Sequence, residues 1–186
     1  MWKGGPAAPD VRPGPPAGAA CTGIAAGVGF GAMAIWLVRH GETEWSISGQ
    51  HTGTTDIAPT PEGELQAIAI GKLLAGRGFD HVFASPMTRA QQTARPAEFG
   101  ERIVVTEELR ECDYGEFEGG TTKRIREIHP GWELFRDGCP GGETPEAMAE
   151  RIGRFLVLWN RRIAPHAVLV ADIATALART THGGPR

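Results

Sequence analysis

The stretch that decides the fold is Ala34–Trp45, AIWLVRHGETEW, in which a short apolar run leads directly into Arg39, His40 and Gly41. An uninterrupted apolar run of this length is typical of a strand that is buried on both faces of a parallel sheet. Ligands of such sheets bind beyond the carboxyl ends of the strands. The sequence therefore places Arg39 and His40 on the edge of the sheet at which a ligand is expected.

Strand and helix patterns alternate on the carboxyl side of this stretch. Further apolar runs predict strands at His81–Ala84, Ile103–Val105 and Ala167–Ala171. Cap and proline signals predict helices that begin at Thr60-Pro61-Glu62 and at Thr144-Pro145-Glu146, and further helices over Thr88–Phe99 and Thr121–Ile128. This order of elements predicts an α/β domain with a mainly parallel sheet flanked by helices.

Two of these helices carry an apolar stripe that is expected to face the core. In the first helix the stripe consists of Leu65, Ile68 or Ala69, and Leu73. In the last helix it consists of Met148, Ile152, Phe155 and Trp159. Trp132 is also expected in the core.

Reactive side chains follow three of the predicted strands. Arg39 and His40 follow the first strand, Arg89 follows the second, and a run with Glu107, Glu108 and Glu111 follows the third. Two guanidiniums on one edge suit a phosphoryl group, because their planar forks bind its oxygens in bidentate fashion. An imidazole beside them can attack phosphorus, and a carboxyl group can protonate the leaving alcohol. The sequence therefore predicts phosphoryl-transfer chemistry.

Three segments together, RHGETEW, SPMTRAQQTA and LRECDYGEFEG, resemble the histidine phosphatase superfamily, also called phosphoglycerate mutase-like. The resemblance runs from Met33 to about Ala171 and is greatest for the branch of bacterial acid phosphatases and sedoheptulose-bisphosphatase. It implies the phosphoglycerate mutase-like fold. It also implies hydrolysis of small phosphorylated metabolites in a ping-pong cycle that needs no metal or other cofactor.

The resemblance also implies a role for individual residues. His40 is the expected nucleophile, Arg39 and Arg89 hold the phosphoryl group, and Glu111 acts as general acid and then as base, with Glu108 as the alternative. Further pocket positions are expected at Ser46, Thr52, Gly53 and Tyr114, the last near the substrate entrance. His51 is expected in a pocket wall or at the surface, and Cys112 is expected to be an inert thiol.

The sequence departs from the family pattern after Ala171. The family has a second catalytic histidine, followed by glycine, where this chain has Asp172 and Ile173; the only later histidine is His182. A carboxylate at that position opposes phosphate binding. Three functions therefore stay open: a working phosphatase, a catalytically impaired remnant that binds phosphate, and mutase-type phosphoryl transfer. We also hypothesise that the segment after Ala171 arises from a frameshift or truncation.

These motifs and the amino-terminal composition divide the chain into three parts. Residues 1–32, which hold eight Gly, five Pro and eight Ala, are expected to form a disordered extension. Residues 33–171 form the phosphatase-like domain, and 172–186 an atypical tail. The alternative hypothesis for residues 1–32 is that Met33 is the natural start of the protein. A membrane anchor over Ala19–Val38 is disfavoured, because Gly and Ala transfer poorly into lipid.

Composition excludes several functional classes. Lys+Arg 19 against Asp+Glu 22 gives a net charge of −3, so a broad basic surface for nucleic acid is not expected. Cys21, Cys112 and Cys139 are too widely spaced for a disulfide framework or a zinc site, which favours a reducing, cytoplasmic location. The expected partner is a small phosphorylated metabolite, with no nucleic acid and no membrane. Substrate identity and oligomeric state are left open.

Overall fold

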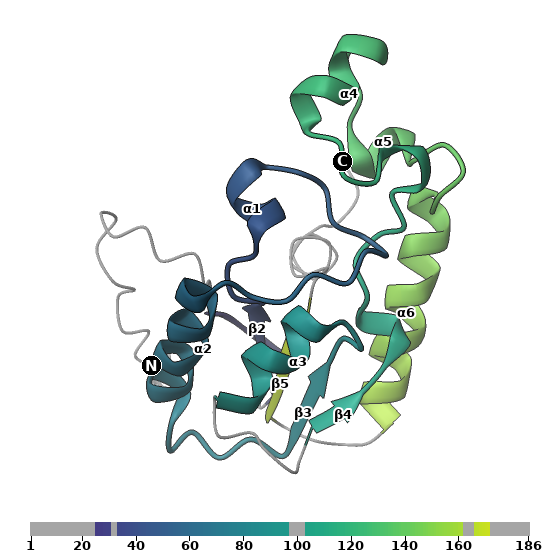
Figure 1. Ribbon diagram of the computed structural model, residues 1–186. Helices are drawn as coiled ribbons and strands as arrows, with labels where there is room; N and C mark the ends of the chain where they lie inside the picture. Colours follow the sequence, from purple (N-terminus) through teal and green to yellow (C-terminus); the bar gives the residue numbers. More distant parts are fainter. Residues whose placement is uncertain (1–24, 31–32, 97–102, 162–165, 172–186) are drawn as a thin grey trace, which may run out of the picture.

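The structure, a computed structural model, describes residues 25–30, 33–96, 103–161 and 166–171 (Figure 1). The strands are β1 (Ala25–Phe30), β2 (Met33–Arg39), β3 (His81–Ala84), β4 (Ile103–Val105) and β5 (His166–Ala171). The helices are α1 (Glu44–Ser48), α2 (Pro61–Leu74), α3 (Thr88–Ala94), α4 (Thr122–Ile128), α5 (Leu134–Asp137) and α6 (Pro145–Arg161). Two 3₁₀ turns, η3 (Glu107–Leu109) and η4 (Gly115–Phe117), precede α4.

The strands form one sheet in the order β1-β2-β5-β3-β4. Strands β2, β5, β3 and β4 run parallel, and β1 pairs antiparallel with β2. Arg39 at the end of β2 lies opposite Ala171 at the end of β5, and Ala84 at the end of β3 lies opposite Val170. The predicted α/β class with a mainly parallel sheet is confirmed, and the carboxyl ends of these strands meet at one edge.

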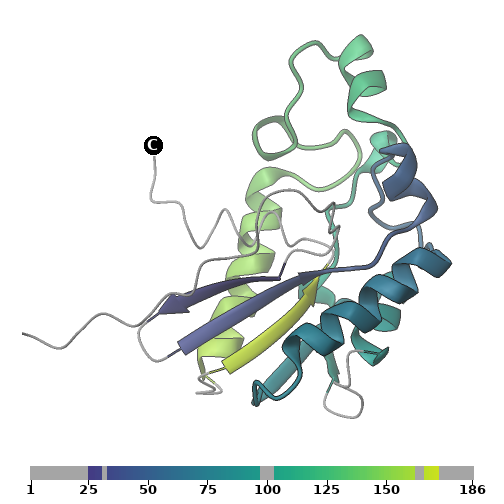
Figure 2. The ribbon, with the colours of Figure 1, turned by 90° about the vertical axis from the view of Figure 1, so that its left-hand side faces the viewer.

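Helices cover both faces of the sheet, with α2 and α3 on one face and α6 on the other (Figure 2). Alternate strand residues divide between the two sides, as the pleat of a strand requires. Leu37 and Phe83 belong to the core that α6 covers, where Phe155 meets Phe83 edge to face at 5.3 Å. Val38 and Val82 belong to the second core, beneath α2 and α3. Arg39 is the last residue of β2 and His40 is the next, so both are at the strand end between these two cores.

The predicted helix starts and the stripe on α6 agree with the structure. The Thr60 hydroxyl accepts a hydrogen bond from the Gly63 amide at the start of α2, and Pro61 occupies the first turn. Met148, Ile152 and Phe155 are buried on α6, whereas the side chain of Trp159 lies outside the described residues. Trp132 is in the core as predicted.

The predicted apolar face of α2 is wrong. Leu65 and Leu73 are each 60% exposed, and the buried face carries Ala67, Ile70 and Leu74. Gly63 and Gly71 belong to the buried face as well. Small residues let a helix approach a sheet closely, so the face with the smaller side chains packs inward even though the opposite face is equally apolar.

The structure also differs from the expected extension over residues 1–32, because β1 occupies Ala25–Phe30 within that range. Its sequence, AAGVGF, has low strand propensity, and pairing with the edge of β2 supplies the backbone partners that local sequence does not. The remainder of that range, Cys21, and the tail after Ala171 with Asp172, Ile173 and His182 lie outside the described residues.

Among the described residues, no helix combines the length and the apolar character that crossing a bilayer requires.

Candidate active site

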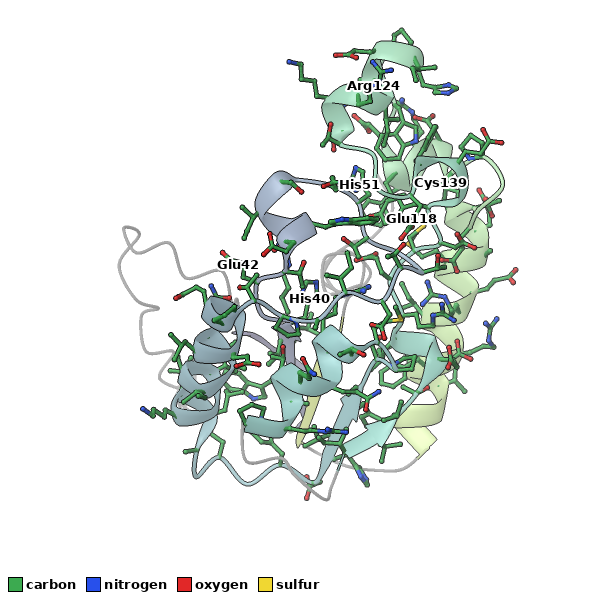
Figure 3. All side chains as sticks on the ribbon, viewed as in Figure 1. His40, Glu42, His51, Glu118, Arg124 and Cys139 are labelled. Carbon is green, nitrogen blue, oxygen red and sulfur yellow. The ribbon has the colours of Figure 1, made fainter. Side chains whose placement is uncertain are left out.

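His40 lies directly after β2 and is 8% exposed. Its Nδ1 is 2.7 Å from the carbonyl oxygen of Gly41. A carbonyl can only accept, so Nδ1 carries the proton and the lone pair of the neutral ring is on Nε2. This tautomer is the one in which Nε2 can act as a nucleophile. Figure 3 shows the ring at the top of the sheet, between the loops that follow the strands.

A pair of hydrogen bonds connects the loop after His40 to the helix that carries Arg89. The Gly41 amide donates to the hydroxyl of Thr93 at 2.8 Å, and that hydroxyl donates to the Arg89 carbonyl at 2.7 Å. Thr93 is fully buried. The nucleophile predicted on the first strand and the arginine predicted after the second are therefore held by one buried side chain.

The guanidinium of Arg89 is completely buried. Its Nη1 donates to the Thr55 carbonyl at 3.0 Å, and its Nη2 donates to the carbonyls of Gly53 at 3.1 Å and Thr52 at 3.3 Å. A buried guanidinium requires such partners, because an unsolvated charge without hydrogen bonds is costly. The loop over residues 52–55 thus fixes the position of the arginine. Arg39, by contrast, is exposed at the end of β2.

Glu111 borders a hollow of about 460 Å³, whose lining includes Thr54 of the loop around Arg89 but none of Arg39, His40 and Arg89 themselves. Its Oε1 accepts a hydrogen bond from the Cys112 amide at 2.9 Å. The hollow is lined by Thr54, Glu107, Arg110, Glu111, Asp113, Gly142, Glu143 and Arg151. The alternative acid, Glu108, instead faces α6, where its carboxylate pairs with Arg154 at 3.2 Å. Of the two carboxylates, Glu111 is the one beside an open space.

The predicted pocket hydroxyls and amides have partners within the protein. The Ser46 hydroxyl donates to the Thr43 carbonyl at 2.8 Å and takes part in the capping box of α1. The Thr52 hydroxyl contacts the Gln50 carbonyl at 3.4 Å, and the Gly53 amide donates to the Glu118 carboxylate at 2.9 Å. In this conformation these groups build the loops around the site.

Tyr114 is 6% exposed, so it is buried beside the site and does not line an open entrance. Burial raises the pKa of its hydroxyl well above the ordinary value, and the Glu111 carboxylate raises it further. The ring stacks on His51, with the two ring centroids 4.6 Å apart. His51 meets Trp132 edge to face and contacts the Thr122 hydroxyl through Nε2 at 3.0 Å. His51 is therefore part of an aromatic wall.

The structure adds two residues that the sequence did not single out, Thr93 and Glu118. Both lie in the quoted motif segments, SPMTRAQQTA and LRECDYGEFEG. Motif membership was the only signal for them, because their partners are distant in sequence: Gly41 for Thr93 and the loop at Gly53 for Glu118.

Cys112 is fully buried, in the same core cluster as Cys139. The pKa of the Cys112 thiol is raised far above its usual range by its hydrogen bond with the Cys139 thiol and by burial. A thiol of raised pKa is a poor nucleophile at neutral pH, which supports the inert reading of Cys112.

We expect the pH dependence of stability to report on His51. Burial lowers the pKa of its imidazole in the folded chain, against a smaller raising effect of Glu118. The unfolded chain therefore binds more protons, so the stabilising contribution is complete above the unfolded pKa of 6.5 and is lost as pH falls toward the folded value. Thermal denaturation of the wild type and of His51→Gln checks this: the variant is expected to lose less stability on acidification below about pH 6.5.

The control for this measurement is His129→Gln, because His129 is exposed at the end of α4. An equal flattening of the pH dependence in both variants would contradict the assignment to His51.

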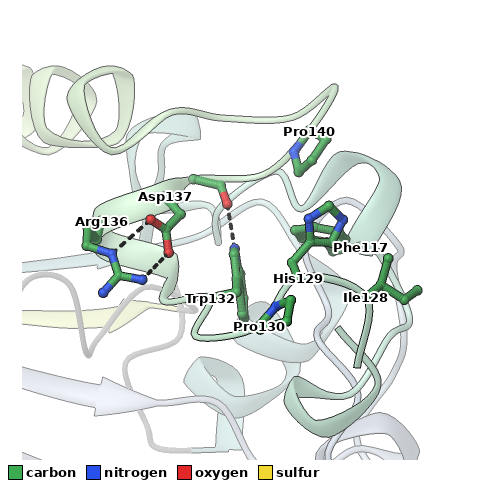
Figure 4. Close-up of a pocket in the computed structure, with 9 residues that line it drawn as sticks. Phe117, Ile128, His129, Pro130, Trp132, Arg136, Asp137 and Pro140 are labelled. Carbon is green, nitrogen blue, oxygen red and sulfur yellow. Dashed lines mark hydrogen bonds and ion pairs between the residues drawn. The ribbon is translucent and has the colours of Figure 1, made fainter. Parts of the chain in front are cut away.

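A second hollow, of about 410 Å³, lies beside α4 and α5 (Figure 4). The Trp132 indole donates to the Gly138 carbonyl at 2.8 Å on one side of it. On the rim, hydrogen bonds from Arg136 lower the pKa of the Asp137 carboxyl to about 2, with the Glu133 backbone amide contributing. None of its lining residues belongs to the nucleophile, the arginines or the acid proposed from the sequence.

The chain is similar in sequence to proteins of one known family. Residues 35–179 match the family model described as histidine phosphatase superfamily, branch 1. A Mycobacterium tuberculosis acid phosphatase is 39% identical over 137 residues, 73% of this chain and 67% of that protein. Sedoheptulose 1,7-bisphosphatase of Saccharomyces cerevisiae is 38% identical over 141 residues, 63% of this chain. The chain spans about half the length of that yeast relative, 52%.

A solved structure shares the fold. It is that of a putative alpha-ribazole-5'-P phosphatase from Escherichia coli, which superposes with a TM-score of 0.71 at 28% identity. The match covers 83% of this chain and 82% of that chain.

Proposed function

The chain belongs to the histidine phosphatase superfamily, and from that premise we propose that it hydrolyses small phosphorylated metabolites through a phosphohistidine on His40. The observation that carries this proposal is the pair of contacts around the nucleophile. The Nδ1–H of His40 donates to Gly41, which turns the lone pair to Nε2. The Gly41 amide is in turn tied through Thr93 to the buried Arg89.

In the first half-reaction, Nε2 of His40 attacks phosphorus and the bond from phosphorus to the ester oxygen breaks. Arg89 and Arg39 bind the phosphoryl oxygens and offset their charge. Glu111, in its protonated form, gives its proton to the departing alcohol, which leaves through the hollow that it borders.

In the second half-reaction, the Glu111 carboxylate takes a proton from water, and the water oxygen attacks phosphorus. The bond from phosphorus to Nε2 breaks, inorganic phosphate leaves, and Glu111 is protonated again. Glu111 gives up one proton in the first half-reaction and takes one back in the second, so the proton balance closes without a cofactor.

The alternative is a remnant that binds phosphate but turns over slowly or not at all. One feature of the sequence favours this alternative. β5 ends opposite Arg39, and the next residue is Asp172, where the family has its second histidine. Loss of one transition-state donor typically costs about 10²–10³ in rate. The arginines and His40 would in that case still bind an anion.

The experiment combines turnover with binding. The purified chain is incubated with a generic aryl phosphate, and thermal stability is measured with and without inorganic phosphate. Hydrolysis supports the phosphatase, whereas phosphate-dependent stabilisation without hydrolysis supports the remnant. A chain that neither hydrolyses the ester nor is stabilised by phosphate contradicts both.

A further inference from the structure

The loop over residues 52–55 lies between a cation and an anion. Its carbonyls face the buried Arg89, as described above. Its amides face Glu118: Oε1 accepts from Gly53 at 2.9 Å and from Thr55 at 3.0 Å, and Oε2 is 3.1 Å from the Gly53 amide. The dipole of the peptide between Thr52 and Gly53 is therefore aligned from the carboxylate toward the guanidinium, an arrangement that stabilises both charges.

Close packing gives this loop little freedom to adjust. A Cβ at Gly53 would lie 2.3 Å from the Cys112 carbonyl oxygen and 2.7 Å from Glu118 Oε2. The backbone of the loop thus rests directly against the segment that carries Glu111, and no side chain separates them. A change in the position of the loop changes the carbonyls that hold Arg89.

Glu118 is itself held in place by the backbone on either side of it. The amide of Glu118, directly after η4, donates to the carbonyl of Gly115, the first residue of that turn. The next two residues are bonded to His51, which directly precedes the loop. The Gly119 amide donates to the His51 carbonyl, and the His51 amide donates to the Gly120 carbonyl, each at 2.9 Å. The carboxylate is therefore presented to the loop from a fixed turn.

From these contacts we infer that Glu118 is a positioning residue for phosphate binding, acting through the 52–55 loop on Arg89. The inference rests on the proposed function, because it takes Arg89 to be a phosphate ligand. A carboxylate is needed for the task, since both of its oxygens only accept. A glutamine has one accepting oxygen, and its NH₂ group would face amides that can only donate.

The test is a comparison of Glu118→Gln and Glu118→Asp with the wild type. Aspartate keeps the charge but shortens the reach by one methylene. Affinity for inorganic phosphate is measured by calorimetry, and KM and kcat are measured with an aryl phosphate. We expect affinity in the order wild type, Asp, Gln, with a loss of roughly 10- to 100-fold for Gln, since small displacements of a positioning group have effects of that size. KM rises correspondingly, and kcat changes less.

The matched control is Glu116→Gln, an exposed carboxylate of the same turn, which is expected to bind phosphate like the wild type. A merely structural role of Glu118 would lower the folded fraction and leave the affinity of the folded molecules unchanged. Circular dichroism separates these outcomes. If Glu118→Gln does not fold, the Asp variant alone decides the question.

A double variant adds a test specific to the route. If Glu118 acts through Arg89, Glu118→Gln is expected to weaken phosphate binding far less in an Arg89→Lys background than in the wild type. Unchanged phosphate affinity in the folded Glu118 variants overturns the inference and leaves the proposed function standing. A wild type that neither hydrolyses the aryl phosphate nor binds inorganic phosphate overturns both.

Discussion

His40→Ala is expected to abolish hydrolysis of an aryl phosphate, lowering kcat/KM by roughly 10⁴-fold or more, as removal of a covalent nucleophile does in enzymes that depend on one. Alanine has no atom that can bond to phosphorus, and a water molecule is not held at that position as the imidazole is. The measurement is steady-state hydrolysis by both proteins. Brief exposure to a labelled phosphate ester, followed by acid and base treatment, is expected to reveal an acid-labile, base-stable adduct in the wild type alone.

The control is His81→Ala. His81 is at the amino end of β3, at the opposite edge of the sheet from His40, so its removal is expected to leave turnover unchanged. Denaturation curves for both variants separate loss of chemistry from loss of fold. Substantial hydrolysis by a folded His40→Ala protein, or an adduct on a residue other than His40, would refute the proposed mechanism.

Signals that are local in sequence predicted the elements that position this histidine. The apolar run before Arg39 and the Thr-Pro-Glu starts of α2 and α6 each report short-range preferences, for burial or for capping, and the structure has the elements they predict. β1 was not predicted, because its Gly and Ala residues carry almost no strand preference and only the edge of β2 makes the strand favourable.

The face of α2 shows why periodicity alone was insufficient. Leu65 and Leu73 define one apolar stripe, and Ala67, Ile70 and Leu74 define another. Periodicity selects a helix but cannot rank two apolar faces. The choice depends on how closely the helix must approach β2 and the loop after it, which is a property of the assembled sheet.

The same distinction applies to the site. The types of residue at the strand ends predict the chemistry that we propose, and His40 directly follows β2, as the sequence placed it. The hydrogen-bond partners could not be predicted from the sequence, because they join distant segments. Glu118 bonds to Gly53 across 65 residues, and Thr93 bonds to Gly41 across 52. Ser46, an expected pocket position, donates its hydroxyl hydrogen to the Thr43 carbonyl within the same turn.

Gly63→Ala is expected to destabilise the protein by about 1–3 kcal/mol or more, against the usual gain for this change inside a helix. A Cβ at Gly63 would lie 2.3 Å from the Glu42 carbonyl oxygen and 2.8 Å from its amide nitrogen. Glu42 cannot easily move, because its amide donates to Gln66 and its carbonyl accepts from Thr60, both on or beside α2. Chemical denaturation measures the free energy, and activity is expected to fall too, since Glu42 follows His40 by two residues.

Gly153→Ala provides the matched comparison. Gly153 is on α6, and a Cβ there would meet nothing within 4 Å. Alanine removes the backbone freedom that glycine has in the unfolded chain, so this variant is expected to be about 0.5–1 kcal/mol more stable than the wild type, with unchanged turnover. The same substitution in two helices then changes the stability in opposite directions, because Gly63 packs against the loop after His40 and Gly153 faces open space. Equal effects at both positions would show that α2 does not hold the loop after His40.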